Sequence, residues 1–194
     1  MERNVFDRLD IEIEQQTDEV EESNHNKDTV VQLPKVNFKK EKIKLDANLC
    51  NIGNSAIWSV SSARLESGID FLMDANPKTF WQSNGNIPHY INMRWARRVF
   101  VQSIVVVVNV KEDDSYCPSK ISVRYTTDGV DLIEKGVISM DTDDNVGVIV
   151  FQPVLWTFHL QFCILENFLK GRDSRIRGLF VLGPSSIRSS PPND

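Results

Sequence analysis

Residues 156–164 read WTFHLQFCI, an alternation of apolar and polar side chains with a period of two. Successive side chains of a β-strand point to opposite faces, so this pattern predicts a strand with one face on a core and the other toward water. Trp156, Phe158 and the other apolar residues of this parity are expected to face the core. His159 has the opposite parity, which predicts a solvated strand histidine.

The same period recurs outside this stretch. Residues 90–95 and 121–126 also alternate, whereas residues 104–108 and 179–182 are apolar on both parities and are predicted as strands covered on both faces. Only residues 70–74 suggest a short helix. Turn residues separate the runs at Asn84-Gly85, Asp113-Asp114-Ser115, Thr127-Asp128-Gly129, Asp143-Asp144-Asn145 and Lys170-Gly171. The sequence therefore predicts an all-β fold, an antiparallel jelly-roll β-sandwich.

The length of 194 residues suits one domain with extensions, and 41% apolar and 25% charged residues are ordinary for a globular protein. Ten of the 27 acidic residues but three of the 22 basic residues lie in residues 1–28, where Val5, Leu9 and Ile13 are spaced for one or two amphipathic turns. We predict a disordered acidic and lysine-rich extension over residues 1–45, a domain over 46–184 and a flexible tail over 185–194.

The rest of the chain is nearly neutral, which argues against binding to a nucleic-acid backbone. A charged N-terminus and the lack of a long apolar run predict neither a signal peptide nor a membrane span, so we expect the protein in the nucleus and cytoplasm. Cys50, Cys117 and Cys163 are far apart and predict buried free thiols rather than a disulfide framework or a zinc site.

Residue constellations typical of enzymes are missing from the sequence. We assign both aspartate pairs, Asp113/Asp114 and Asp143/Asp144, to hairpin turns, and we interpret His89 as a hydrogen-bonding loop histidine. The sequence thus predicts a non-catalytic protein without a metal or a cofactor.

Two loops carry the candidate binding residues. Residues 80–89, FWQSNGNIPH, lead from aromatic residues into a polar tip, which is either a ligand-binding rim or a turn whose amides satisfy its own backbone. Residues 166–177, ENFLKGRDSRIR, combine three arginines with Phe168 and Leu169, a mixture that suits peptides. An internal Arg–Asp pair that only holds the second loop is an equal alternative.

Four stretches in order are similar to the Doc-domain family of the anaphase-promoting complex, and together they cover roughly residues 46–184. They are GNSAIWSVSS (53–62), FWQSNGNIPH (80–89), SYCPSKISVR (115–124) and GRDSRIR (171–177). The resemblance implies a galactose-binding-like jelly roll without enzymatic activity. It also implies a role in cell-cycle control, as co-receptor with an activator subunit for destruction-box (Arg-x-x-Leu) degrons, which promotes processive ubiquitination.

The resemblance further implies which residues bind the degron. They are Gln82, Ser83, Asn84, Asn167, Phe168, Lys170, Arg172, Asp173 and Arg175. If both loops serve one peptide, Gln82 and Arg172 must lie at the same end of the domain. Phe168, Lys170 and Arg175 stand where members of the family carry histidine, asparagine and histidine.

The partners implied by the family are scaffold and tetratricopeptide-repeat subunits, an activator with a β-propeller, and destruction-box peptides. Relatives that end in Ile-Arg dock this terminus on a tetratricopeptide-repeat subunit; here Ile187-Arg188 is followed by six residues. The alternative function is a carbohydrate-binding module, for which Trp81 could be a platform if it faced outward, although its place in the sequence suggests burial.

Overall fold

A computed structural model describes residues 49–184 apart from residue 75 and residues 141–145. The predicted extension (1–45), the predicted tail (185–194) and the Asp143-Asp144 turn lie outside these residues. The domain boundaries therefore stay predictions. Within the described residues no helix is long and apolar enough to cross a membrane.

The described chain is built mainly from antiparallel strands, in agreement with the predicted fold class. The strands are β1 (Leu49–Asn51), β2 (Ile57–Val60), β3 (Trp81–Gln82), β4 (His89–Val107), β5 (Pro118–Thr126), β6 (Ile133–Ser139), β7 (Val146–Asn167), β8 (Arg175–Ile176) and β9 (Gly178–Pro184). The helical turns are η2 (Ile52–Ser55), η3 (Ile69–Leu72), α1 (Val110–Asp113), η4 (Asp114–Tyr116) and η5 (Phe168–Lys170).

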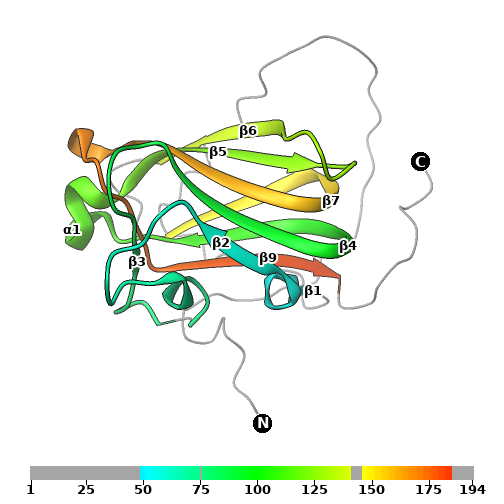
Figure 1. Ribbon diagram of the computed structural model, residues 1–194, viewed down its shortest axis with the longest axis horizontal. Coiled ribbons are helices and arrows are strands. Elements are labelled where there is room, and N and C mark those ends of the chain that lie inside the picture. Colours follow the sequence, from blue (N-terminus) through cyan, green and yellow to red (C-terminus); the bar gives the residue numbers. More distant parts are fainter. Residues whose placement is uncertain (1–48, 75, 141–145, 185–194) are drawn as a thin grey trace, which may run out of the picture.

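Two long strands, β4 and β7, bend and contribute to both layers of the sandwich (Figure 1). The N-terminal part of β4 pairs with β2 and with the C-terminal part of β7, which also pairs with β5; β6 lies beyond β5 at the sheet edge. The C-terminal part of β4 pairs with β9 and with the N-terminal part of β7, and β1 lies beyond β9. Two layers packed face to face in this way bury one face of each.

The bend changes which side chains face the core. The register between β4 and β7 shifts between Arg94 and Val99. Leu160 on β7 is buried, as its position in the alternating pattern predicted. At the bend, however, Thr157 is buried and Phe158 is only half-buried. The parity predicted for residues 156–158 is therefore wrong, because a strand that passes from one layer to the other changes its inward-facing side.

Side chains of both layers fill the core. Residues 104–108 and 179–182 are buried throughout, which confirms the prediction of strands covered on both faces. Trp81 is completely buried as well, so it offers no outward platform for a sugar. The short helix predicted at residues 70–74 is the single 3₁₀ turn η3, which spans Ile69–Leu72.

Other predictions need correction. Asp113 and Asp114 do not form a hairpin turn, because α1 and η4 connect β4 to β5. His159 is 8% exposed rather than solvated. Cys117 and Cys163 are buried free thiols as predicted, but Cys50 is exposed. Burial, reinforced by Asp113, raises the pKa of the Cys117 thiol to about 12.

Candidate functional site

The two candidate loops meet at one end of the sandwich, where β3 and β8 form a short antiparallel ladder that pairs Gln82 with Arg175. Just beyond it, the Ser83 N–H donates to the Ser174 carbonyl at 2.9 Å, and the Ser174 N–H donates to Ser83 Oγ at 2.7 Å. This end carries β3 and α1, on the left in Figure 1. The expectation that both loops share one end of the domain is confirmed.

Asp173 joins three loops. Its carboxylate accepts hydrogen bonds from the Arg64 guanidinium at 2.6 Å and from the Gly85 N–H at 2.9 Å, with a longer contact of 3.5 Å from Gln82 Nε2. Partial burial opposes ionisation, but these donors outweigh it and hold the pKa of Asp173 below its usual range. Among the described residues, Asp173 pairs with Arg64 from a third loop and with no arginine of residues 166–177, so the predicted pair internal to the second loop is wrong.

Asn167 acts as an internal brace of the second loop. Its buried amide donates to the carbonyls of Gly171 and Asp173, at 3.1 and 2.9 Å, and accepts a hydrogen bond from Ser174 Oγ at 2.9 Å. These contacts occupy the side chain and fix the path of residues 171–174. Asn167 therefore shapes the surface instead of projecting from it.

Arg175 is held in a similar way. Its Nε donates to Gln82 Oε1 at 3.0 Å, and its guanidinium lies between the rings of Phe80 and Tyr116, at 4.3 and 4.2 Å from their centroids. Stacking on two aromatic faces restricts the guanidinium to one plane. Gln82 and Arg175, which come from the two different predicted loops, are thereby held together.

A buried ion pair between Arg177 and Asp113 stabilises the end of the sandwich that carries the two loops. Arg177 donates two hydrogen bonds of 2.8 Å to the Asp113 carboxylate and one of 2.7 Å to the Pro77 carbonyl. Hydrogen bonding to Asp113 outweighs the opposing effect of burial and raises the pKa of Arg177. The pair joins α1 to the segment between β8 and β9, so it fixes the second loop relative to the rest of the sandwich.

The path of the second loop depends on a close backbone approach at Gly171. A β-carbon at this position would lie 1.6 Å from the Ser115 carbonyl oxygen, so no other residue fits without moving the chain. Leu169 and Lys170, directly before it, have left-handed φ angles of 51° and 59°. This turn leaves Leu169 75% exposed at the rim.

The predicted site residues divide into held and exposed ones. Held within the fold are Gln82, Ser83, Asn167, Asp173 and Arg175, and Phe168 packs half-buried against the core. Exposed are Asn84, Lys170 and Arg172. Hydrogen bonds position the exposed group as well: Arg172 Nε donates to Asn86 Oδ1 at 2.8 Å, and His89 Nε2 donates to the Arg172 carbonyl at 2.7 Å. His89 is thus the hydrogen-bonding histidine that the sequence predicted.

The four exposed residues Asn84, Leu169, Lys170 and Arg172 form a surface at this end, the loop surface. They present an amide, an apolar side chain and two cations on a rigid base, which can bind backbone carbonyls and one apolar side chain of an extended peptide. No group of three or more His, Cys, Asp or Glu side chains that could hold a metal occurs among residues the structure describes.

Sequence reasoning missed Arg64, whose partner Asp173 is 109 residues away. No local pattern around Arg64 signals this pairing. It also missed the role of Asp113, because its neighbours Asp114 and Ser115 resemble an ordinary turn.

Solved structures share this architecture at low sequence identity. The chain matches the family 32 carbohydrate-binding module of NanJ from C. perfringens, solved with galactose, with a TM-score of 0.59 and 14% identity over 68% of this chain and 96% of that chain. The corresponding module of AlyQ, solved with 4,5-unsaturated mannuronic acid, gives a TM-score of 0.53 and 15% identity over 64% and 92%. The fold therefore defines a galactose-binding-like jelly-roll domain.

Proteins of similar sequence identify the family more closely than the solved structures do. A family model described as "Anaphase-promoting complex, subunit 10 (APC10)" matches residues 14–194. Anaphase-promoting complex subunit 10 of Homo sapiens is 35% identical over 72% of this chain and 80% of the relative, and subunit DOC1 of Saccharomyces cerevisiae is 30% identical over 72% and 58%. The chain belongs to the family of anaphase-promoting complex subunit 10.

Proposed function

We propose that this protein is a non-catalytic subunit of an anaphase-promoting complex and serves, with an activator subunit, as co-receptor for destruction-box degrons of substrates. Family membership supports its place in the complex. The single structural observation that supports the co-receptor role is the loop surface, whose backbone is held from inside by buried side chains: Asn167 donates to the Asp173 carbonyl and His89 to the Arg172 carbonyl. Such preorganisation reduces the entropy cost of binding a flexible peptide.

The chemistry of the loop surface fits an extended peptide. Lys170 and Arg172 offer several N–H donors to backbone carbonyls, Asn84 can donate and accept, and Leu169 offers an apolar contact for the degron leucine. This contact would be weak alone. Next to an activator it gains from effective concentration, which lengthens the residence of the substrate and favours processive ubiquitination.

The test is a comparison of substrate residence times on the reconstituted complex with its activator, by single-molecule fluorescence. A variant with Lys170→Ala and Arg172→Ala should shorten residence about fivefold to tenfold, since loss of about 1–1.4 kcal/mol changes an equilibrium by that factor. The charge-matched control, Arg97→Ala with Arg98→Ala at the other end of the domain, should leave residence unchanged. Equal residence times for both variants would refute the proposed site.

The remaining parts of the proposal concern partners and location. We infer docking on scaffold and tetratricopeptide-repeat subunits, with the protein in nucleus and cytoplasm. Affinity purification from native extract followed by mass spectrometry tests the first inference, and imaging of the tagged chain tests the second. If the affinity-purified chain carries neither a cullin nor a tetratricopeptide-repeat subunit, the proposed place in the complex is contradicted.

Carbohydrate binding has support only from the fold. Sugar sites use exposed aromatic rings, whereas Trp81 is buried and Phe80 and Tyr116 enclose Arg175. A glycan array with the full chain distinguishes the two functions, and binding abolished by Arg172→Ala would favour a sugar site on the loop surface.

A further inference from the structure

We propose that the acidic N-terminal segment, residues 1–28, docks on a basic and apolar surface at the bend of the sandwich, opposite to the loop surface. This arginine surface consists of Ile57, Arg94, Arg97, Arg98, Val130 and Phe158. It lies where β4 and β7 turn from one layer into the other, at the right of Figure 1. The inference does not depend on the proposed degron site.

Three cations lie close together on the arginine surface. Arg94, Arg97 and Arg98 fall within five residues of β4, and all three are exposed. None of them forms an ion pair with another residue in the described part of the chain. Arg98 lies over the Phe158 ring, 5.3 Å from its centroid. These guanidinium groups are therefore available to carboxylates.

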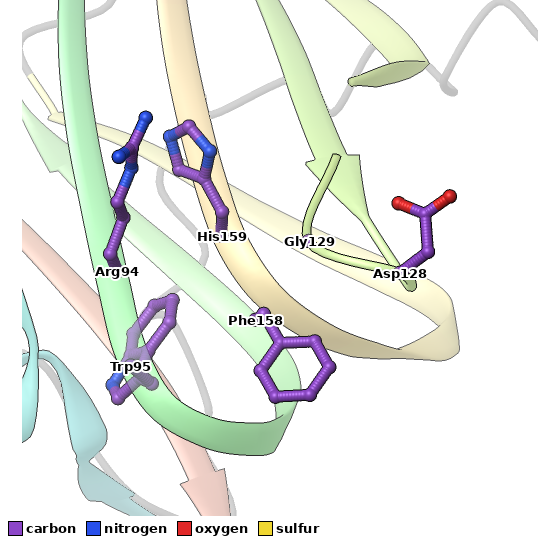
Figure 2. Close-up of a pocket in the computed structure, with 6 residues that line it drawn as sticks. All are labelled: Arg94, Trp95, Asp128, Gly129, Phe158 and His159. Atoms are coloured by element: carbon purple, nitrogen blue, oxygen red, sulfur yellow. The ribbon is translucent and has the colours of Figure 1, made fainter. Parts of the chain in front are cut away.

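Apolar groups lie beside these cations. Ile57, the partner of Arg94 in the β2–β4 ladder, is 77% exposed, and Val130 is 79% exposed. A hollow of about 270 Å³ beside Arg94 is lined by Arg94, Trp95, Asp128, Gly129, Phe158 and His159 (Figure 2). Exposed apolar side chains around a hollow offer contact area to a peptide that has apolar side chains of its own.

The carboxylate of Asp128, which lines the same hollow as Arg94, is already engaged in its own turn. Asp128 accepts hydrogen bonds from Thr126 Oγ1 at 2.6 Å and from the Val130 N–H at 2.9 Å, within its own turn. His159 adds no charge near neutral pH, because burial and Arg94 lower its pKa. The arginine surface is thus net positive.

The N-terminal segment matches the arginine surface in charge and in apolar content. Residues 1–28 carry ten acidic and three basic residues, and Val5, Leu9 and Ile13 are spaced for one side of a helix. An acidic segment with one apolar side complements a surface of arginines and exposed apolar residues.

The point where the chain enters the fold favours this occupant. β1 begins at Leu49, which pairs with Pro184 at the C-terminal end of β9. The next segment contacts the bend directly, because Trp95 Nε1 donates to the Ile52 carbonyl at 3.0 Å. The twenty residues 29–48 can span up to roughly 70 Å when extended, more than this distance requires. A tether of this length provides a high effective concentration, so weak individual contacts suffice.

The experiment measures paramagnetic relaxation in the full chain. A spin label at Ser23→Cys, in a Cys50→Ser background, is selective because burial raises the pKa values of Cys117 and Cys163. The Gly129 amide and the Trp95 indole N–H at the bend should lose most of their intensity. The Gly85 amide and the Trp81 indole N–H, at the loop end, serve as matched reporters that should keep theirs.

Charge variants then test the contacts. Arg97→Glu with Arg98→Glu should restore the Gly129 signal, and Lys170→Glu with Arg172→Glu should not. Glu19→Gln, Glu21→Gln and Glu22→Gln should weaken the effect without any change to the sandwich, and so should high salt. Loss of signal at Gly85 instead of Gly129, at neither reporter, or only between molecules in a mixture of labelled and unlabelled chains would overturn the proposal.

Discussion

The two ends of the sandwich use arginine in opposite ways. At the loop end, Arg175 and Arg177 are locked by aromatic rings, carboxylates and a carbonyl. At the bend, Arg94 and Arg97 are exposed and have no ion-pair partner in the described part of the chain. Identical side chains therefore support a rigid surface at one end and remain free for a partner at the other. What separates the two sets is a carboxylate within reach, since Asp113 lies beside Arg175 and Arg177, whereas an aromatic ring also lies beside Arg98 at the bend.

The largest loss of stability is expected when the carboxylate of Asp113, which binds the loop-end arginines, is removed. Asp113→Ala leaves the buried Arg177 without its partner, which should reduce the free energy of unfolding by about 3–5 kcal/mol. Urea unfolding monitored by tryptophan fluorescence measures this loss. The neighbouring exposed Asp114 provides the control, since Asp114→Asn should change stability by less than about 0.5 kcal/mol. A loss for Asp113→Ala as small as that of the control would mean that the ion pair does not support the loop end.

A second change displaces the second loop. In Gly171→Ala the new methyl group meets the Ser115 carbonyl, so the loop must move, at a cost of about 1–3 kcal/mol. Under the proposed function, substrate residence on the reconstituted complex should shorten as well. Gly68→Ala is the matched control, because nothing lies within 4 Å of a β-carbon there. Equal stability and residence for the two variants would contradict the close approach.

Each end of the sandwich has one carboxylate whose pKa is lowered, Asp173 at the loop end and Asp128 at the bend. A lowered pKa stabilises the folded state above the pKa of the unfolded chain, and this stability is lost as the pH falls through the folded pKa. Asp173→Asn and Asp128→Asn should therefore each flatten the loss of stability below about pH 4.

Only one of these variants should affect binding. Asp173→Asn weakens the junction with Arg64 and Gly85, with a cost on the order of 0.5 kcal/mol after solvent screening. Residence times on the complex should shorten for Asp173→Asn and stay unchanged for Asp128→Asn. A shorter residence for Asp128→Asn would place the degron contact at the bend.

The sequence predicts what depends on local patterns. The period of two identifies the strands, and two polar loops at strand ends are enough to expect the loop surface. Patterns of this kind carry no information about the bend, where the core parity changes at Phe158, or about the pair of Arg64 with Asp173, which depends on a fold that brings distant loops together. Asp113 shows the same limit. The sequence around it resembles a turn, but its carboxylate binds Arg177, which belongs to a distant segment.

His159 is a buried titratable residue at the bend. Burial, assisted by the charge of Arg94, lowers its pKa, so the folded state binds a proton less readily than the unfolded state. Stability from this group is present above the unfolded pKa, near 6.5, and decreases as the pH falls below it. Between pH 7.5 and pH 5.5 the free energy of unfolding should therefore decrease slightly, as measured by urea titration.

His159→Gln isolates this contribution, since the amide of glutamine can still donate to Asn92 Oδ1, which accepts from His159 Nε2 at 3.0 Å. The slope of the free energy of unfolding between pH 7.5 and 5.5 should flatten in this variant. If wild type and His159→Gln keep the same slope, protonation of His159 does not oppose folding, and the bend is more open to water than its 8% exposed histidine indicates.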